Sequence, residues 1–303
     1  MKNIIAIDIG GSSIKSAIIK SDGSFLKNSC KISEIDSNEN KDYIIDKFIF
    51  PIAQSIQHLN KYKINLDGIA ISICGPFNYE KGISLIKNLD KYESIYNVNI
   101  KKVIRERLLL PNKIPIVFDP DAWSFGRGEV NFNNYENYNK IIVFTMGTGI
   151  GSCFIENKKI VSEGKGIPWF GWVSGQKYKD GILNDYTSSI FMKKKYFEIT
   201  KENISIKSMA ERARKNDKNA KAIFNEMGNT LGSFLKENFV DEFETNCIIF
   251  GGQISMASDL FIDKIQYHLQ KCKYLKKITK AKDIQFAALK GAAQLLFEKN
   301  QDE

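Results

Sequence analysis

The chain has 303 residues, of which 43% are hydrophobic, so it is long enough to form two domains with sizeable cores. Its formal charge is +9, but 44 basic residues are interspersed with 35 acidic ones, which favours solubility and attraction for small anions over a nucleic-acid surface. Because charges, Gly or Pro interrupt every apolar run and we see no secretory leader, we expect a cytoplasmic protein without a membrane partner.

The cysteines support the same compartment. Cys30, Cys74, Cys153, Cys247 and Cys272 are widely separated and form no pattern typical of a metal site. We therefore expect buried thiols in a reducing environment.

The first pattern begins almost at the first residue. An apolar stretch over residues 4–9 carries Asp8 and is followed by Gly10-Gly11-Ser12-Ser13 and a second apolar stretch over residues 16–19. This predicts a β-hairpin whose tip can hold an anion, because the glycines let a phosphate approach the backbone, the serines add donors and Lys15 adds a cation. Asp8 suits a hydrated Mg²⁺. The alternative is a polar hairpin turn without a ligand.

A strand and a helix are predicted next. Residues 24–32 predict a third strand, and apolar positions at helical spacing predict an amphipathic helix from about Lys41 to His58. Pro51 either kinks this helix or divides it. Residues 66–74 then read as a buried strand that stops at Gly75-Pro76.

The carboxyl end of that strand is a predicted ligand position. In an open α/β sheet, ligands bind where strands end and turns begin. Asn88, a little further on, offers an amide donor and acceptor to the same site, or is simply a turn asparagine.

Carboxylates end the next strand. After a helix over residues 101–109, a strand from residue 114 leads to Asp119, Pro120 and Asp121. We choose Asp121 as a general base or, alternatively, the N-cap of the following helix. Asp119 faces the other way on a strand and is expected to pair structurally. Glu129 either supports the site or is solvated.

Two further blocks repeat the opening arrangement of strand and glycine turn. Residues 141–155 form a strand, the turn Gly147-Thr148-Gly149-Ile150-Gly151 and a second strand, and residues 247–255 end a strand on Gly251-Gly252 before a helix. Three such turns in this order resemble the two phosphate loops and the adenosine loop of the sugar kinase and actin superfamily.

Taken together, the blocks resemble the ROK family of bacterial sugar kinases and sugar-responsive repressors. The likeness includes a C-terminal stretch, residues 287–293, and covers nearly the whole chain. It implies an α/β, actin-like (ribonuclease H-like) fold with mixed sheets and flanking helices. Residues 1–120 would form the N-terminal domain, residues 121–288 a larger domain, and residues 289–303 a helix packing back on the first. No helix-turn-helix fits before the first strand, which argues against a DNA-binding repressor.

The resemblance also implies the chemistry. ATP with Mg²⁺ would lie between the two domains, and its terminal phosphoryl group would pass to a sugar hydroxyl. Asp121 would be catalytic, and Gly75, Pro76 and Asn88 would contact the sugar. The helical region over residues 190–240 would contribute to a homodimer.

The chain departs from the family pattern at two places. The family's zinc cluster should fall between residues 171 and 183, which contain no Cys or His, so we predict that no zinc binds. Among the sugar contacts, Trp169-Phe170-Gly171-Trp172 stands where the family has a Glu-x-x-Gly-His motif. Pro120 replaces an asparagine, and Asn184 replaces a glutamate.

All three tryptophans, Trp123, Trp169 and Trp172, fall in this acceptor region. They either rebuild a core that the zinc subdomain would otherwise supply, or form an apolar wall for a sugar that bears an acyl group. The second interpretation favours the 6-hydroxyl of an N-acetylated hexosamine such as N-acetylmannosamine as acceptor. The alternatives are a glucokinase-type hexose kinase and a non-catalytic sugar or nucleotide sensor.

Overall fold

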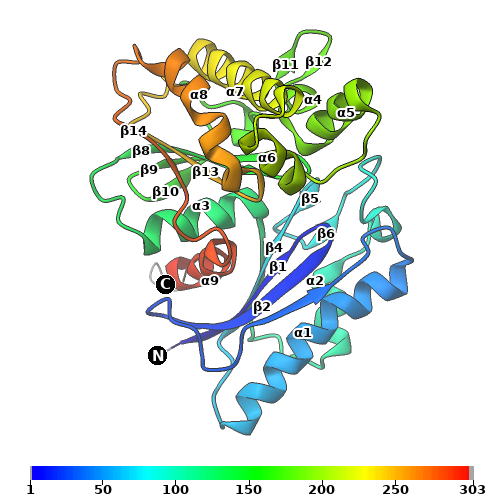
Figure 1. Cartoon of the computed structure of the whole chain (residues 1–303). Helices are drawn as coiled ribbons and strands as arrows, with labels where there is room; N and C mark the ends of the chain where they lie inside the picture. Colours follow the sequence, from blue (N-terminus) through cyan, green and yellow to red (C-terminus); the bar gives the residue numbers. More distant parts are fainter. Residues whose placement is uncertain (1, 300–303) are drawn as a thin grey trace. The chain divides into compact units, whose positions relative to one another are not determined.

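A computed structural model of the chain describes residues 2–299, which divide into two compact units (Figure 1). The first unit runs to Phe132 and resumes at Gln285, and the second comprises Asn133–Ile284. The first unit therefore extends beyond the boundary expected at residue 120 and includes helix α3 (Asp121–Phe132). The expected C-terminal helix is α9 (Ala287–Lys299) in that same unit, and the last residues of the prediction, 300–303, lie outside the described residues.

The first unit is built on a five-stranded sheet with the order β3-β2-β1-β4-β7. Strand β1 is antiparallel to β2 and parallel to β4, which is parallel to β7. Besides α3 and α9, its elements are β1 (Asn3–Ile9), β2 (Ser13–Lys20), β3 (Lys31–Glu34), α1 (Lys41–Lys61), β4 (Gly68–Ile73), β5 (Phe77–Asn78), β6 (Ile83–Ser84), the 3-10 turn η1 (Glu93–Ile95), α2 (Ile100–Arg107) and β7 (Ile116–Pro120).

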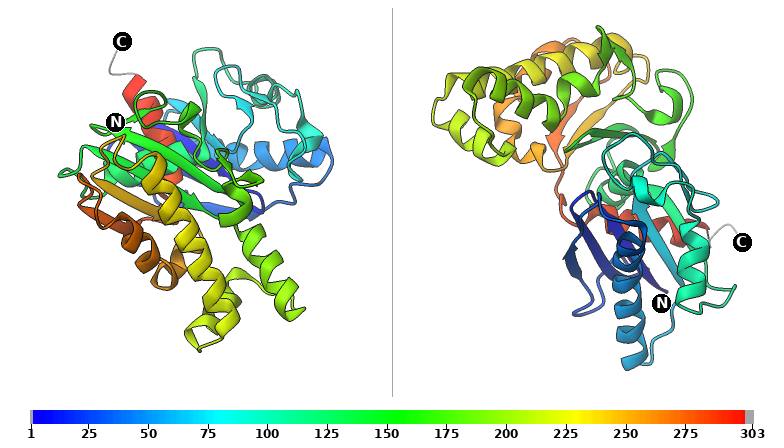
Figure 2. Two further views of the ribbon diagram at one scale, coloured as in Figure 1. Left: turned by 90° about the horizontal axis from the view of Figure 1, so that it is seen from above. Right: turned by 90° about the vertical axis from the view of Figure 1, so that its right-hand side faces the viewer.

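Alternation along β1 gives this sheet two apolar faces. Ile5 and Ile7 point into a core shared with α1 and α2, whereas Ile4 and Ala6 point into a core shared with α9. The helices on the two faces can be followed in Figure 1 and Figure 2. Helix α1 begins after its N-cap Asn40 and continues through Pro51 to Lys61, so the proline does not divide it.

The predicted third strand is wrong in its position. Strand β3 is Lys31–Glu34, and residues 24–30 turn instead of running straight. The buried Ser29 side chain explains the turn, because its Oγ accepts from the Ile18 amide at 3.1 Å and donates to the Leu26 carbonyl at 2.7 Å. These side-chain hydrogen bonds compete with a regular strand ladder.

The second unit repeats the strand plan of the first. Its five-stranded sheet has the order β10-β9-β8-β13-β14, and β8 is antiparallel to β9 and parallel to β13, which is parallel to β14. Its elements are β8 (Lys140–Met146), β9 (Ile150–Glu156), β10 (Lys159–Val161), η2 (Trp169–Gly171), β11 (Lys177–Tyr178), β12 (Gly181–Ile182), α4 (Asn184–Thr187), α5 (Ser189–Thr200), α6 (Ile206–Arg214), α7 (Lys218–Asn238), β13 (Cys247–Gly251), η3 (Ile254–Leu260), α8 (Ile262–Leu269) and β14 (Lys277–Lys280).

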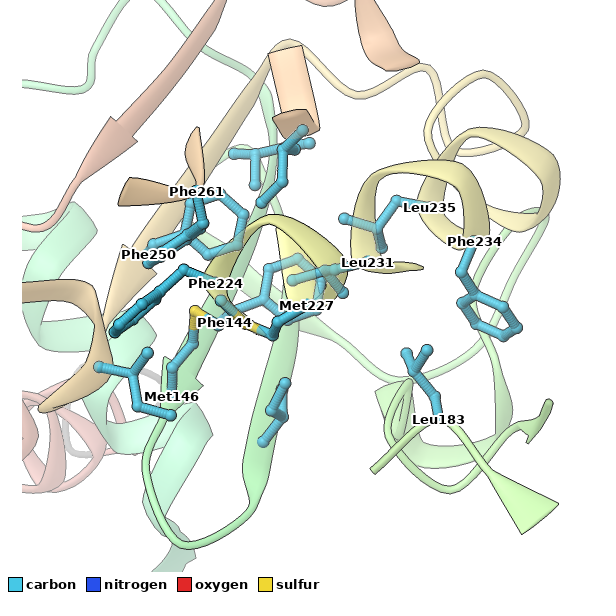
Figure 3. Close-up of a cluster of buried hydrophobic side chains, with 14 of the residues drawn as sticks. Phe144, Met146, Leu183, Phe224, Met227, Leu231, Phe234, Leu235, Phe250 and Phe261 are labelled. Carbon is cyan, nitrogen blue, oxygen red and sulfur yellow. The ribbon is translucent and has the colours of Figure 1, made fainter. Parts of the chain in front are cut away.

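Aromatic side chains fill the core of the second unit (Figure 3). Phe144 of β8 stacks on Phe250 of β13 with ring centroids 5.5 Å apart, and Phe261 meets Phe250 edge to face at 6.1 Å. Phe224 and Leu231 of α7 close over them. This packing fixes the two strands whose glycine turns concern the candidate site.

Two general expectations can be compared with the structure. Within residues 2–299, no helix combines the length and apolar character needed to cross a membrane. Cys74, Cys153, Cys247 and Cys272 are buried, but Cys30 is exposed, contrary to the expectation for the cysteines as a group, because it follows the Ser29 turn and lies outside the strands.

Candidate active site

The first group of site residues lies at one edge of the first sheet. The register pairs Ile9 with Ile73 and Ile73 with Pro120, so the parallel strands β1, β4 and β7 end level with one another. The residues that follow, Gly10, Cys74 and Asp121, therefore lie at the same carboxyl edge, where ligands bind in open α/β sheets.

Asp8 lies one register row before this edge. Its Oδ1 accepts from Ser72 Oγ at 3.0 Å, and its Oδ2 lies 3.4 Å from Lys15 Nζ. One oriented carboxylate next to an anion-binding turn fits Mg²⁺, which is usually held by one or two carboxylates together with substrate phosphates and water.

The first glycine turn joins β1 to β2. The Gly10 amide donates to the Ser13 carbonyl at 2.9 Å, and the Ile35 amide donates to the Ser12 carbonyl at 3.2 Å. A Cβ atom at Gly11 would meet no heavy atom within 4 Å. The turn is thus fixed by its own backbone bonds while Gly11 stays open to an approaching ligand.

Asp121 is the first residue of α3. Its Oδ1 accepts from the Ala122 amide at 2.8 Å. Burial raises the pKa of the Asp121 carboxyl, and the carboxylates of Asp8 and Asp119 raise this pKa further, whereas the Lys91 ammonium and the Ala122 amide lower it. A raised pKa brings a carboxylate closer to the range that suits a general base.

Asp119 has the structural role expected of it. It is buried, accepts from Ser124 Oγ at 2.7 Å and pairs with Arg127 Nη1 at 2.5 Å. Arg127 also lies 3.7 Å from Glu298 of α9. The pair therefore fixes the start of α3, and Asp121 with it. Glu129 is fully buried, so its alternative as a solvated residue is wrong.

The segment after β4 brings further groups to the same unit. Gly75-Pro76 is a cis peptide, and the Tyr79 hydroxyl oxygen lies 3.0 Å from where a Cβ of Gly75 would be. Asn88 is exposed with φ 58°, which fits the turn interpretation and leaves its amide accessible to a ligand. Sequence reasoning missed Lys91, whose ammonium group lowers the pKa of the Asp121 carboxyl and of the Cys74 thiol.

It also missed Tyr92. This side chain is fully buried against Phe48, and its hydroxyl donates to the Gly10 carbonyl at 2.5 Å. The only signal in the sequence is an aromatic residue shortly after Asn88, which cannot indicate a contact across 82 positions.

The second glycine turn joins β8 to β9 in the second unit. The Gly147 amide donates to the Gly149 carbonyl at 2.9 Å, and the Ser189 amide donates to the Gly147 carbonyl at 3.1 Å. Asn184 Oδ1 accepts from the Ile150 amide at 3.1 Å, so Asn184 supports the turn. Thr148 and Gly149 are exposed at its tip. A pocket of about 550 Å³ opens beside Asn184 and Ser188.

The third glycine turn adjoins the second through the sheet. Gly251 is paired with Thr145, which is paired with Gly151. Gly252 has φ 77°, and a Cβ there would lie 2.5 Å from the Met146 carbonyl oxygen. Only glycine fits this position, because both the backbone angle and the space exclude a side chain.

The aromatic turn, residues 168–173, belongs to the same unit. The Ser152 hydroxyl, one residue after Gly151, donates to the Gly171 carbonyl at 2.6 Å and accepts from the Val173 amide at 3.0 Å. Trp169 and Trp172 are 77% and 50% exposed. The interpretation that these two indoles rebuild a core is therefore wrong, whereas the apolar-wall interpretation stays a prediction.

Within the described part of the chain, no three or more His, Cys, Asp and Glu side chains gather in a way that could hold a metal ion. The absence of zinc stays a prediction from the ligand-poor stretch 171–183.

Comparisons with known proteins agree with this geometry. The model of the ROK family matches residues 4–299. A β-glucoside kinase from Listeria monocytogenes serovar 1/2a is 23% identical over 280 residues, covering 88% of this chain and 87% of that protein.

Two solved structures are similar in fold. The first is a ROK family glucokinase from Streptomyces griseus in complex with glucose and AMPPNP, with TM-score 0.75 and 20% identity, covering 97% of this chain and 98% of that chain. The second is a candidate N-acetylmannosamine kinase from Listeria monocytogenes, also with TM-score 0.75 and 20% identity, covering 98% of this chain and 99% of that chain.

Proposed function

Because this chain belongs to the ROK family, we propose that it is a kinase that transfers the γ-phosphoryl group of ATP to a sugar hydroxyl, with Asp121 as the general base. One observation carries the proposal most directly. Asp8, the first glycine turn and Asp121 come together at the carboxyl edge of one sheet, and Asp8 raises the pKa of Asp121. An anion-binding turn with a carboxylate at the same sheet edge suits phosphoryl transfer to an alcohol, which depends on positioning the phosphates and orienting the hydroxyl.

The base acts on the acceptor. A sugar hydroxyl is a weak nucleophile, and the Asp121 carboxylate takes its proton as the oxygen forms a bond to the γ-phosphorus. The bond to the β-phosphate breaks, and ADP leaves with that electron pair. The products are a sugar phosphate, ADP and the proton held on Asp121.

The nucleotide is held by glycine turns. In the first unit, the open Gly11, Ser12, Ser13 and Lys15 would bind phosphate oxygens. In the second, Gly147, Thr148, Gly149 and Gly151 would bind phosphate, and Gly251 and Gly252 would contact the adenosine. Asp8 would hold Mg²⁺, which neutralises charge on the β- and γ-phosphates when bound.

We assign the acceptor to an N-acetylated hexosamine such as N-acetylmannosamine, phosphorylated on its 6-hydroxyl. Gly75, Pro76 and Asn88 of the first unit would contact the sugar ring, and Asn184 would add an amide. The exposed indoles of Trp169 and Trp172, whose centroids are 6.5 Å apart, offer apolar surface for the acetyl methyl group. The structural likeness to a candidate N-acetylmannosamine kinase supports this choice.

A β-glucoside is the second candidate acceptor. Phe170 packs next to Trp169 in the aromatic turn, with ring centroids 5.7 Å apart, and is 36% exposed, so three aromatic side chains are exposed within four residues. Such a surface also suits the second ring or aglycone of a glycoside. The β-glucoside kinase of Listeria monocytogenes, matched along most of this chain, favours that alternative.

We also propose a homodimer that uses the helical region after residue 190. Ile190, Phe197 and Ile199 of α5 are 59%, 42% and 51% exposed, which is apolar surface that a partner would cover. Light scattering at working concentration tests this, and a monomer would contradict it.

A panel of acceptors tests the function. Glucose, N-acetylglucosamine, N-acetylmannosamine, fructose, allose and a β-glucoside disaccharide are each incubated with ATP and Mg²⁺, and ADP release is followed. We expect turnover with N-acetylmannosamine, and Asp121→Asn should lower kcat by about a hundredfold or more. Asp42→Asn, the same change at an exposed position of α1, is the matched control and should leave kcat unchanged.

The outcomes separate the hypotheses. No turnover with any acceptor would favour a non-catalytic sensor. Full activity in Asp121→Asn would remove the assignment of the base. If only the disaccharide is turned over, the proposed acceptor changes from a hexosamine to a glycoside. If only glucose is turned over, the protein is a glucokinase-type hexose kinase.

A further inference from the structure

A closed ring of hydrogen bonds surrounds the first glycine turn. It joins three segments of the first unit: the turn itself, the residues after β3, and the loop that follows Asn88.

One link closes the glycine turn on itself, and a second holds it to the residues after β3. The Gly10 amide donates to the Ser13 carbonyl at 2.9 Å, and the Ile35 amide donates to the Ser12 carbonyl at 3.2 Å. Two further links run from Tyr92. Its amide donates to the Ser37 carbonyl at 2.7 Å, and its hydroxyl donates to the Gly10 carbonyl at 2.5 Å.

Tyr92 cannot leave this position without a rearrangement. Its side chain is fully buried, its ring packs on Phe48 with centroids 5.6 Å apart, and its backbone has φ 56°. The loop before it is held as well, because the Glu93 carboxylate accepts from the amides of Leu89 and Asp90 at 2.8 Å and 3.2 Å. A movement of the loop that carries Asn88 and Lys91 must therefore be transmitted to Gly10.

We propose that Tyr92 is a positioning residue that couples the acceptor loop, residues 88–93, to the nucleotide-binding turn. The inference rests on the proposed kinase function, in which ligands bind both segments. A phosphate that binds the turn restrains the Gly10 carbonyl further, and Tyr92 transmits that restraint to the loop. By reciprocity, an acceptor that orders the loop improves the geometry of the turn for ATP.

The consequence is measurable without knowing the acceptor. Hydrogen–deuterium exchange is measured for the wild-type protein, Tyr92→Phe and Tyr96→Phe, each with and without AMPPNP and Mg²⁺. Tyr92→Phe keeps the buried ring and removes the hydroxyl. Tyr96→Phe is the matched control, because it removes the same group from an exposed side chain four residues later.

We expect nucleotide to slow exchange at residues 10–15 in all three proteins and at residues 86–96 in the wild type and Tyr96→Phe. In Tyr92→Phe the slowing at residues 86–96 should fall by about two- to tenfold, the factor that one hydrogen bond supplies. Because each variant is compared with itself, a general loss of stability does not produce this pattern.

Two results would overturn the inference in distinguishable ways. Equal protection of residues 86–96 in Tyr92→Phe, with residues 10–15 protected, would show that the hydroxyl does not couple the segments while leaving the nucleotide site intact. No protection of residues 10–15 in any protein would refute the nucleotide site itself, and this inference with it. Once an acceptor is known, its KM is measured at low and at saturating ATP. In the wild type the KM should be lower at saturating ATP, and in Tyr92→Phe the two KM values should be closer to each other.

Discussion

The crossing of α3 and α9 provides a sharp test, because two physical effects predict opposite signs for one substitution. Gly128 lies inside α3, where replacement of glycine by alanine normally stabilises a helix by about 1 kcal/mol. A Cβ at Gly128, however, would lie 1.8 Å from the carbonyl oxygen of Ala287 and 2.8 Å from the amide nitrogen of Gly291. Gly291 meets α3 in the same way, with a Cβ position 1.8 Å from the Ser124 carbonyl oxygen.

The obstructing atoms decide the magnitude. They belong to the α9 backbone and cannot rotate away, so the helices would have to separate by about 1.5 Å or more to restore ordinary contact near 3.5 Å. Overpacking of this kind costs about 1–3 kcal/mol, and backbone obstruction puts the cost at the upper end. After the helix-propensity gain is subtracted, we expect Gly128→Ala to lose about 2 kcal/mol of unfolding free energy.

Urea unfolding followed by circular dichroism measures this difference, with an unchanged slope as the sign that only stability has changed. Gly11→Ala is the matched control, because its Cβ would meet nothing within 4 Å, and its unfolding free energy should stay within about 0.5 kcal/mol of the wild type or rise. A Gly128→Ala protein as stable as the wild type, or more stable, would show that helix propensity dominates and that the helices do not cross as closely as described.

Three further predictions concern the site. Gly11→Ala should raise the KM for ATP by about tenfold or more while leaving stability intact, because its methyl group occupies the place where phosphate approaches; an unchanged KM would contradict the assignment of that turn. Asp121 must be ionised to act as a base, so kcat/KM should fall as pH decreases through its raised pKa. Because burial disfavours the ionised form in the folded state, Asp121→Asn should melt at or above the wild-type temperature at pH 7 despite its reduced kcat, and a lower melting temperature would show that the charge stabilises the fold. Arg127→Met leaves the Asp119 carboxylate buried without its cation and should lose about 3–5 kcal/mol of unfolding free energy. Adding Asp119→Asn to Arg127→Met should restore part of that free energy, and no restoration would show that the unpaired carboxylate is not the cause of the loss.

Much of the architecture could be predicted because its signals are local. The hairpins around Gly10 and Gly147 are visible as apolar runs separated by glycine turns, and their order along the chain identified the ROK family and the α/β sugar-kinase fold, which the comparisons confirm. The role of Asp119 followed from strand alternation, which requires only that neighbouring side chains point to opposite faces.

The missed features depend on contacts between distant positions. The Tyr92 hydroxyl meets Gly10 across 82 positions, and α3 joins the first unit because Gly128 lets α9 approach it from more than 150 residues away. Hydrophobic periodicity in the sequence predicts helices and strands but does not predict contacts between distant positions. The burial of Ser29 likewise turned a predicted strand into a loop, since a hydroxyl that bonds the backbone cannot be distinguished by sequence from one that faces water.

The exposure of the aromatic turn makes the protein its own optical reporter. Of its three tryptophans, Trp169 and Trp172 carry most of the solvent-exposed indole surface, so the long-wavelength part of the intrinsic emission should report on one short turn. A compound that covers this turn would move the emission to shorter wavelength without any attached label. In a Trp123→Phe background, each candidate acceptor could then be titrated directly against the surface that is proposed to select it.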